Sequence, residues 1–158
     1  MKEFIDWTVF LGMHHSNEDV RISCKNFFIE KLKEGKKIYM SFESVGKCDD
    51  VVWGYERETQ DKYYPFMDVL HSTAKILRLP YQQSYEAAIQ KNKALSGLSF
   101  FDQMTVVIAS EDILYTHNEK ILTLTQNKIQ KPVNGSEQSF PDDLEKLYQQ
   151  SLLLKINW

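Results

Sequence analysis

The sequence predicts an α/β fold with a mostly parallel sheet, and three observations support this fold class. Residues 4–11 are rich in β-branched and aromatic side chains and are followed by a glycine, which is typical of a strand. A helical spacing of apolar residues then runs to Gly35, and residues 37–42 form the next strand candidate. This order predicts two parallel strands joined by a right-handed helical crossover. Because apolar side chains surround Asp6, we expect the first strand to be buried on both faces, as in a parallel sheet.

The remaining elements continue this alternation. We expect Ser16 or Asn17 to cap the first long helix. The pattern then predicts a helical stretch at 43–71 divided or bent by Gly54 and Pro65, a strand at 76–79, helices at 82–92 and 102–110, a strand at 113–116, a helix at 118–122, a polar loop at 126–138 and a helix at 142–154. We therefore expect a domain over residues 1–125 and a segment over 126–158, whose loop and helix pack on the same domain.

Size and composition restrict the classes of protein. The chain has 158 residues, enough for one domain, and 42% of them are hydrophobic, which excludes disorder over most of its length. No apolar run approaches the roughly 20 residues of a membrane-spanning helix. The first residues show no secretory signal, so we expect a cytoplasmic protein with Cys24 and Cys48 as reduced thiols. The net charge of -3 does not favour a dedicated nucleic-acid binder, although a local basic stripe would be enough.

Three acidic residues are placed near the ends of predicted strands or at a helix start. Asp6 lies within the first strand candidate, Glu43 follows the second, and Asp102 begins a hydrophobic helix. Ligands of open α/β sheets bind at the carboxyl ends of the strands, so these side chains are candidates for one site. Two carboxylates about 5 Å apart repel by roughly 3 kcal/mol at an effective dielectric of ~20, and a divalent cation reverses that sign. Taken singly, each acid also has an ordinary reading, as a hydrogen-bonded core acid, a first-turn charge and a helix N-cap respectively.

These residues resemble the PIN domain family of metal-dependent nucleases. The resemblance covers about residues 3–122 and rests on residues 4–11, 40–43, 101–109 and 114–118. It implies a three-layer α/β/α sandwich in which Asp6, Glu43 and Asp102 bind Mg²⁺ or Mn²⁺. The family's fourth position falls on Asn118, with Glu119 beside it. Because Asn118 is neutral, the site would carry one negative charge fewer and would hold a second metal more weakly.

The resemblance implies a metal-dependent endoribonuclease that hydrolyses RNA phosphodiester bonds. It also implies a toxin–antitoxin or RNA-processing role, with an antitoxin or other protein partner, and a homodimer is an open possibility. The alternative is a PIN-like interaction module with weak or no catalysis, favoured by the acidic balance, Asn118 and the aromatic residues 63–67. A third reading is hydrolysis of a smaller phosphate ester.

Several other residues are candidates for auxiliary roles. His14 and His15 follow the first strand and would overlook the same crevice, unless they lie in a solvated loop. Asp50 follows Glu43 by two helical turns and would extend the metal site. The aromatic residues 63–67 would stack bases or form a dimer surface if they are not core, and the lysines of residues 31–37 would guide a phosphate backbone if they flank the acids.

Overall fold

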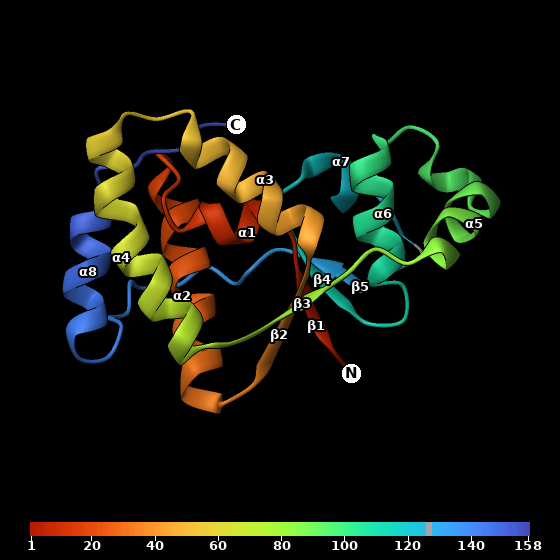
Figure 1. The fold of residues 1–158 in the computed structure, drawn as a ribbon. Helices are drawn as coiled ribbons and strands as arrows, with labels where there is room; N and C mark the ends of the chain where they lie inside the picture. Colours follow the sequence, from red (N-terminus) through yellow and green to blue (C-terminus); the bar gives the residue numbers. More distant parts are fainter. Residues whose placement is uncertain (126–127) are drawn as a thin grey trace.

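The computed structural model describes residues 1–125 and 128–158 and shows helices on both sides of a parallel sheet (Figure 1). Its strands, among the described residues, are β1 (Glu3–Ile5), β2 (Lys37–Ser41), β3 (Lys75–Leu79), β4 (Ile113–Tyr115) and β5 (Lys128–Gln130). They lie in the order β3-β2-β1-β4-β5, and every neighbouring pair is parallel. The predicted three-layer α/β/α sandwich is confirmed.

The helices separate into two layers because consecutive residues of a strand face opposite sides of the sheet. The helices are α1 (Trp7–Gly12), α2 (Glu18–Glu34), α3 (Phe42–Trp53), α4 (Arg57–Thr73), α5 (Gln83–Lys91), α6 (Phe100–Ile108), α7 (Glu119–Leu122) and α8 (Asp143–Ser151), with a short 3-10 helix at Lys93–Leu95. Ile5 packs into a large core with α1, α2, α3, α4 and α8, whereas Phe4 packs into a smaller one with α6 and α7. In Figure 1 these two groups lie to the left and right of the sheet.

The first predicted strand is too long in the sequence reading. β1 ends at Ile5, and Asp6 is the N-cap of α1 because its side chain accepts a hydrogen bond from the Thr8 backbone N–H. Both β1 and α1 are buried, so their apolar residues form one continuous run. Such a run does not show where the strand pattern ends and the helical pattern begins. Asp6 therefore lies immediately after the strand, at its carboxyl end.

Local signals for the ends of helices are confirmed. Asn17 caps α2 by accepting from the backbone N–H groups of Asp19 and Val20. Gly35 ends α2 in the left-handed conformation at φ 64°. The stretch 43–71 divides after Trp53 into α3 and α4, and α4 continues through Pro65 to Thr73.

The region 126–138 is only partly the predicted loop. Residues 128–130 form β5, which pairs with β4, while 126–127 lie outside the described residues. This strand is three residues long and polar at both ends, so its alternation is too short to recognise in sequence.

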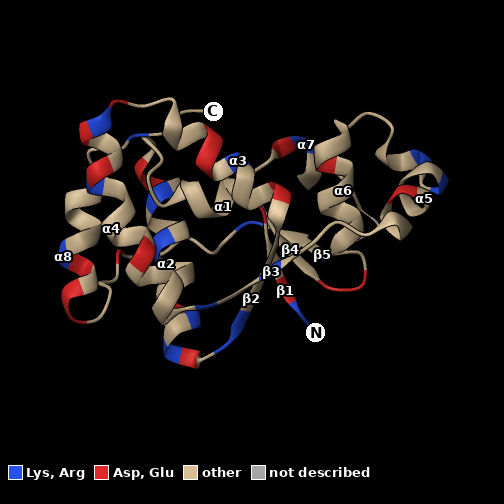
Figure 2. Cartoon of the chain, viewed as in Figure 1, with Lys and Arg blue, Asp and Glu red and all other residues tan. Residues whose placement is uncertain are grey.

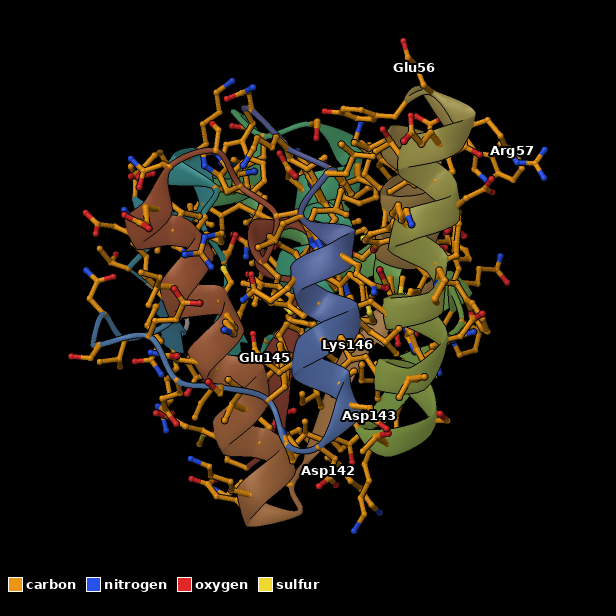
Figure 3. The ribbon with its side chains drawn as sticks, turned by 90° about the vertical axis from the view of Figure 1, so that its left-hand side faces the viewer. Glu56, Arg57, Asp142, Asp143, Glu145 and Lys146 are labelled. Carbon is orange, nitrogen blue, oxygen red and sulfur yellow. The ribbon has the colours of Figure 1, made fainter. Side chains whose placement is uncertain are left out.

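Helix α8 lies between α2 and α4 (Figure 3) and is held there by a buried cation. The Lys25 side chain of α2 is 1% exposed, and its Nζ lies 2.7 Å from Glu137 Oε2 and 2.9 Å from Glu145 Oε1. The same region buries Tyr148 in the large core. Residues after the sheet are therefore part of this core.

Charges are dispersed over the helices, and one concentration of lysines lies at the lower ends of α2 and β2 (Figure 2). Lys36 precedes β2 and Lys37 is its first residue, so both lie at the amino edge of the sheet, whereas Asp6 follows β1 at the carboxyl edge. This cluster does not flank the acids, so the condition under which it would guide a phosphate backbone towards them is not met. No helix among the described residues has both the length and the apolar character needed to cross a membrane.

Candidate active site at the carboxyl edge of the sheet

Asp6 joins the ends of two neighbouring strands. Its Oδ1 accepts hydrogen bonds from the Thr8 backbone N–H at 2.9 Å and from Thr8 Oγ1 at 2.5 Å. Its Oδ2 accepts from Thr116 Oγ1 at 2.5 Å, and Thr116 directly follows β4. The carboxylate is 1% exposed, so these donors replace the water it would otherwise bind.

The charge of Asp6 is poorly compensated by this arrangement. Burial raises the pKa of Asp6 from 3.8 to about 6, although the hydrogen bonds from Thr116 and Thr8 act in the opposite direction. The described part of the chain forms no ion pair to this carboxylate. A cation bound beside Asp6 would restore the ordinary preference for the ionised form.

The two threonine hydroxyls also fix the turn that follows β4. Thr8 Oγ1 accepts from the backbone N–H of His117 at 2.8 Å, and Thr116 Oγ1 accepts from that of Asn118 at 3.0 Å. Asn118 Oδ1 then caps α7 by accepting from the backbone N–H of Lys120 at 3.0 Å. The positions of Asp6 and Asn118 are thus coupled through hydroxyl groups.

An open hollow of about 610 Å³ lies over this network. Thr8, Asp102 and Asn118 are among its lining residues, and Asp6 lies directly behind Thr8. Asp102 is in the first turn of α6. Ser99 is the N-cap of this helix, and its Oγ accepts a hydrogen bond from the backbone N–H of Asp102 at 3.1 Å. The alternative reading of Asp102 as a helix N-cap is therefore wrong, and its half-buried carboxylate is available to the hollow.

Glu43 is placed differently. It lies in the first turn of α3, where Ser41 is the N-cap, and it does not line the hollow. Its Oε2 is buried and has no hydrogen-bond partner among the described residues. The structure thus brings Asp6, Asp102 and Asn118 to one edge of the sheet and leaves Glu43 outside the hollow with an unpaired oxygen.

The donor chemistry of these residues fits a hard divalent cation. Carboxylate and amide oxygens are ligands of Mg²⁺ and Mn²⁺, and Glu43 Oε2, which has no hydrogen-bond partner among the described residues, is an acceptor that an ion would satisfy. Within residues 1–125 and 128–158, however, no three His, Cys, Asp or Glu side chains are close enough to hold an ion as they stand. The donor types of the set therefore fit Mg²⁺ or Mn²⁺, whereas the arrangement of the described side chains does not by itself form a complete site.

The two neighbouring histidines have different environments. His14 is buried among Tyr63, Phe66 and Tyr148, and its Nε2 lies 2.7 Å from Ser151 Oγ. Burial lowers the pKa of His14 to about 3, so it is a neutral core residue. His15 lines the hollow, whereas His14, which was expected to overlook it too, does not.

The other auxiliary candidates are outside the hollow or at its rim. Asp50 is exposed on α3 and does not line the hollow, while Glu119 lines it and forms an exposed ion pair with Lys131 at 2.7 Å. Cys48, which was expected to be a reduced thiol, is free and buried, and burial raises the pKa of its thiol well above 9.0. Within the aromatic segment 63–67, Tyr63 and Phe66 are core residues rather than a stacking or assembly surface.

The lining residues that sequence reasoning missed include Trp7, Thr8, His117 and Trp158. Trp158 reaches the hollow because the backbone of Ile156 pairs with residues 14–16, donating to His14 O and accepting from Ser16 N–H, each at 2.9 Å. No local pattern indicates that contact. His117, in contrast, lies between Thr116 and Asn118, and its place directly after a strand was the available signal.

Comparisons with known proteins agree with this fold. The family described as a family of unknown function, DUF6190, matches residues 1–158. The chain belongs to DUF6190. No curated protein matches this DUF6190 member significantly.

A solved structure similar to this DUF6190 chain comes from VapBC2 of Rickettsia felis, crystallised with a DNA fragment from their promoter. The TM-score is 0.62, and the match covers 83% of this chain and 98% of that chain at 14% identity. At this identity the likeness shows the fold alone, and it is consistent with the PIN-like architecture.

Proposed function

We propose that this protein is a metal-dependent endoribonuclease that hydrolyses RNA phosphodiester bonds at the carboxyl edge of its sheet. One observation carries the proposal: the buried Asp6 carboxylate, held by Thr8 and Thr116, lies directly behind a hollow whose wall contains Asp102 and Asn118. The PIN-like fold supports it by analogy. In this proposal Asp6, Asp102 and Glu43 hold Mg²⁺ or Mn²⁺.

Each residue has a proposed role that follows from its contacts. Thr8 and Thr116 orient the Asp6 carboxylate through their hydroxyl groups. Glu43, whose Oε2 has no hydrogen-bond partner among the described residues, would be a metal ligand or would position the attacking water. Asn118 is committed to capping α7 through Oδ1 and acts as a weak or indirect ligand. When bound, a divalent ion lowers the pKa of water and neutralises charge on the phosphate.

The proposal includes a partner and a location. We propose that this nuclease is a cytoplasmic homodimer. We also propose that a protein antitoxin covers its hollow. The structural likeness to a chain of VapBC2 supports an antitoxin-like partner.

Cleavage of a mixed RNA pool tests the proposal. The wild-type protein should cleave with Mn²⁺ and not with EDTA, and Asp6→Asn and Asp102→Asn should each lower the rate at least a hundredfold. Asp143→Asn is the matched control, because Asp143 is exposed on α8 far from the sheet edge (Figure 3). Cleavage that survives both EDTA and Asp6→Asn would rule the mechanism out.

A second candidate function is a PIN-like interaction module with weak or no catalysis. It is favoured by the absence of a three-residue metal cluster in the described part of the chain and by the hydroxyl groups that already bond Asp6. It predicts that Asp6→Asn leaves the biological activity intact, which separates it from the nuclease.

A further inference from the structure

We propose that the hollow binds one nucleotide of single-stranded RNA, with its base on Trp158 and an oxygen of the nucleotide on the Nε2–H of His15. This subsite deepens the proposed function, on which its choice of RNA rests. It adds residues outside the carboxylate set, from the 13–16 turn and the 155–158 segment.

The protonation state of His15 follows from one hydrogen bond. Its Nδ1 lies 2.9 Å from the backbone nitrogen of Asn17, whose N–H donates to it. Nδ1 therefore carries the lone pair, and the neutral ring carries its proton on Nε2. An Nε2–H is a donor and not a metal ligand, so His15 selects an acceptor oxygen rather than a cation.

That donor has no acceptor among the residues that the structure describes. Nε2 of His15 is buried and makes no hydrogen bond to any described residue, and the same is true of Nε2 of His117. His117 is 9% exposed and lines the same hollow. Buried polar groups are normally paired, so two unpaired ring nitrogens at one hollow indicate a ligand that supplies the missing partners.

Trp158 provides a surface for a base. It is 46% exposed, and its ring meets His15 at a centroid distance of 4.2 Å and Trp7 at 5.4 Å, both edge to face. These contacts fix the indole beside the His15 ring while leaving much of it accessible. Aromatic side chains of this kind stack nucleobases with little sequence preference.

The charges around the hollow are compatible with a phosphate backbone. Asp102 and Glu119 are balanced by Lys120 and Lys131 among the lining residues, and Lys131 pairs with Glu119. A base can lie on Trp158 only when it is unstacked from its neighbours. The site is therefore suited to a single strand rather than to a duplex.

Fluorescence anisotropy with a labelled single-stranded RNA octamer in EDTA tests the subsite without cleavage. Trp158→Ala should weaken binding about tenfold, whereas Trp53→Ala should not, because Trp53 is more exposed at 67% and lies outside the hollow. His15→Asn keeps an acceptor for the Asn17 N–H and removes the Nε2–H, so we expect about fivefold weaker binding. His15→Gln, which restores an N–H at that reach, should bind nearly as the wild type does. Unchanged thermal midpoints show that each variant is folded.

Several outcomes would overturn the subsite. These are equal affinity of Trp158→Ala and Trp53→Ala, equal affinity for a blunt RNA duplex, or equal losses in His15→Asn and His15→Gln. If the wild type cleaves RNA and Trp158→Ala has an unchanged KM, the subsite proposal is wrong and the nuclease proposal stands. If the protein binds single-stranded RNA selectively but cleaves none, the nuclease proposal is wrong and the subsite proposal stands.

Discussion

Thr116 Oγ1 donates a hydrogen bond to Asp6 Oδ2 at 2.5 Å, although the two residues are 110 positions apart. The bond joins the carboxyl ends of β1 and β4 and fixes the carboxylate behind the hollow. Because it donates to a buried charge, it is also among the stronger hydrogen bonds expected in this protein.

Thr116→Val should therefore destabilise the protein by about 2 kcal/mol near neutral pH, because it leaves one oxygen of a buried carboxylate without its donor. Thr116→Ser keeps the hydroxyl and is the matched control, with a loss well below that of Thr116→Val. Urea unfolding measures both. Equal losses would mean that the methyl group, and not the hydroxyl, is what matters.

Asp6 should make the metal-free protein more stable as the pH falls. Its pKa is raised from 3.8 in the unfolded chain to about 6 in the folded one, so the folded state binds the proton more tightly. The stabilisation is complete below pH 3.8 and is lost as the pH rises through 6. From pH 7.5 to pH 5, this linkage adds about 1.4 kcal/mol to the free energy of unfolding.

Asp6→Asn, which does not titrate, isolates this contribution. The difference in stability between the variant and the wild type should change by about 1.4 kcal/mol between pH 7.5 and pH 5. Saturating Mn²⁺ should abolish the change, because a bound cation keeps the carboxylate ionised. A difference that is constant with pH would show that Asp6 is ionised over the whole range.

Lys25→Met should loosen α8. The substitution removes the cation that Glu137 and Glu145 share, and we expect a loss of about 2 kcal/mol. Hydrogen exchange should be faster in the variant than in the wild type, and this increase should be larger across α8 than in the sheet. Lys146→Met, at an exposed position of the same helix (Figure 3), should leave the free energy of unfolding and the exchange rate of α8 nearly unchanged.

Two glycines should respond to alanine with opposite signs. Gly35 has φ 64°, a conformation that costs alanine energy, so Gly35→Ala should destabilise by about 1 kcal/mol. Gly46 lies inside α3 with no atom within 4 Å of an added Cβ, so Gly46→Ala should stabilise by about 1 kcal/mol. Thermal or urea unfolding of the pair checks both, and the same sign in both variants would contradict the prediction.

Some features of this protein were determined by the sequence alone, because they depend on neighbouring residues. Asn17 caps α2 through its own side chain, and Gly35 ends that helix because only glycine adopts its φ without strain. The same holds for most of the order of strands and helices, which follows from local periodicity, although α1 and β5 were not predicted. Together with the PIN resemblance, these features predicted a parallel sheet with acids near its carboxyl edge.

The tertiary structure decided what no local pattern records. Asp6 is a helix cap and not a strand residue, because hydrogen bonds rather than apolar periodicity end β1 there. Glu43 and Asp102 share the predicted edge but not one hollow, since the packing of α3 and α6 sets where each first turn points. Trp158 meets His15 only because the backbone of the 155–158 segment pairs with residues 14–16, a contact between distant segments that burial and hydrogen bonding select after the chain has folded.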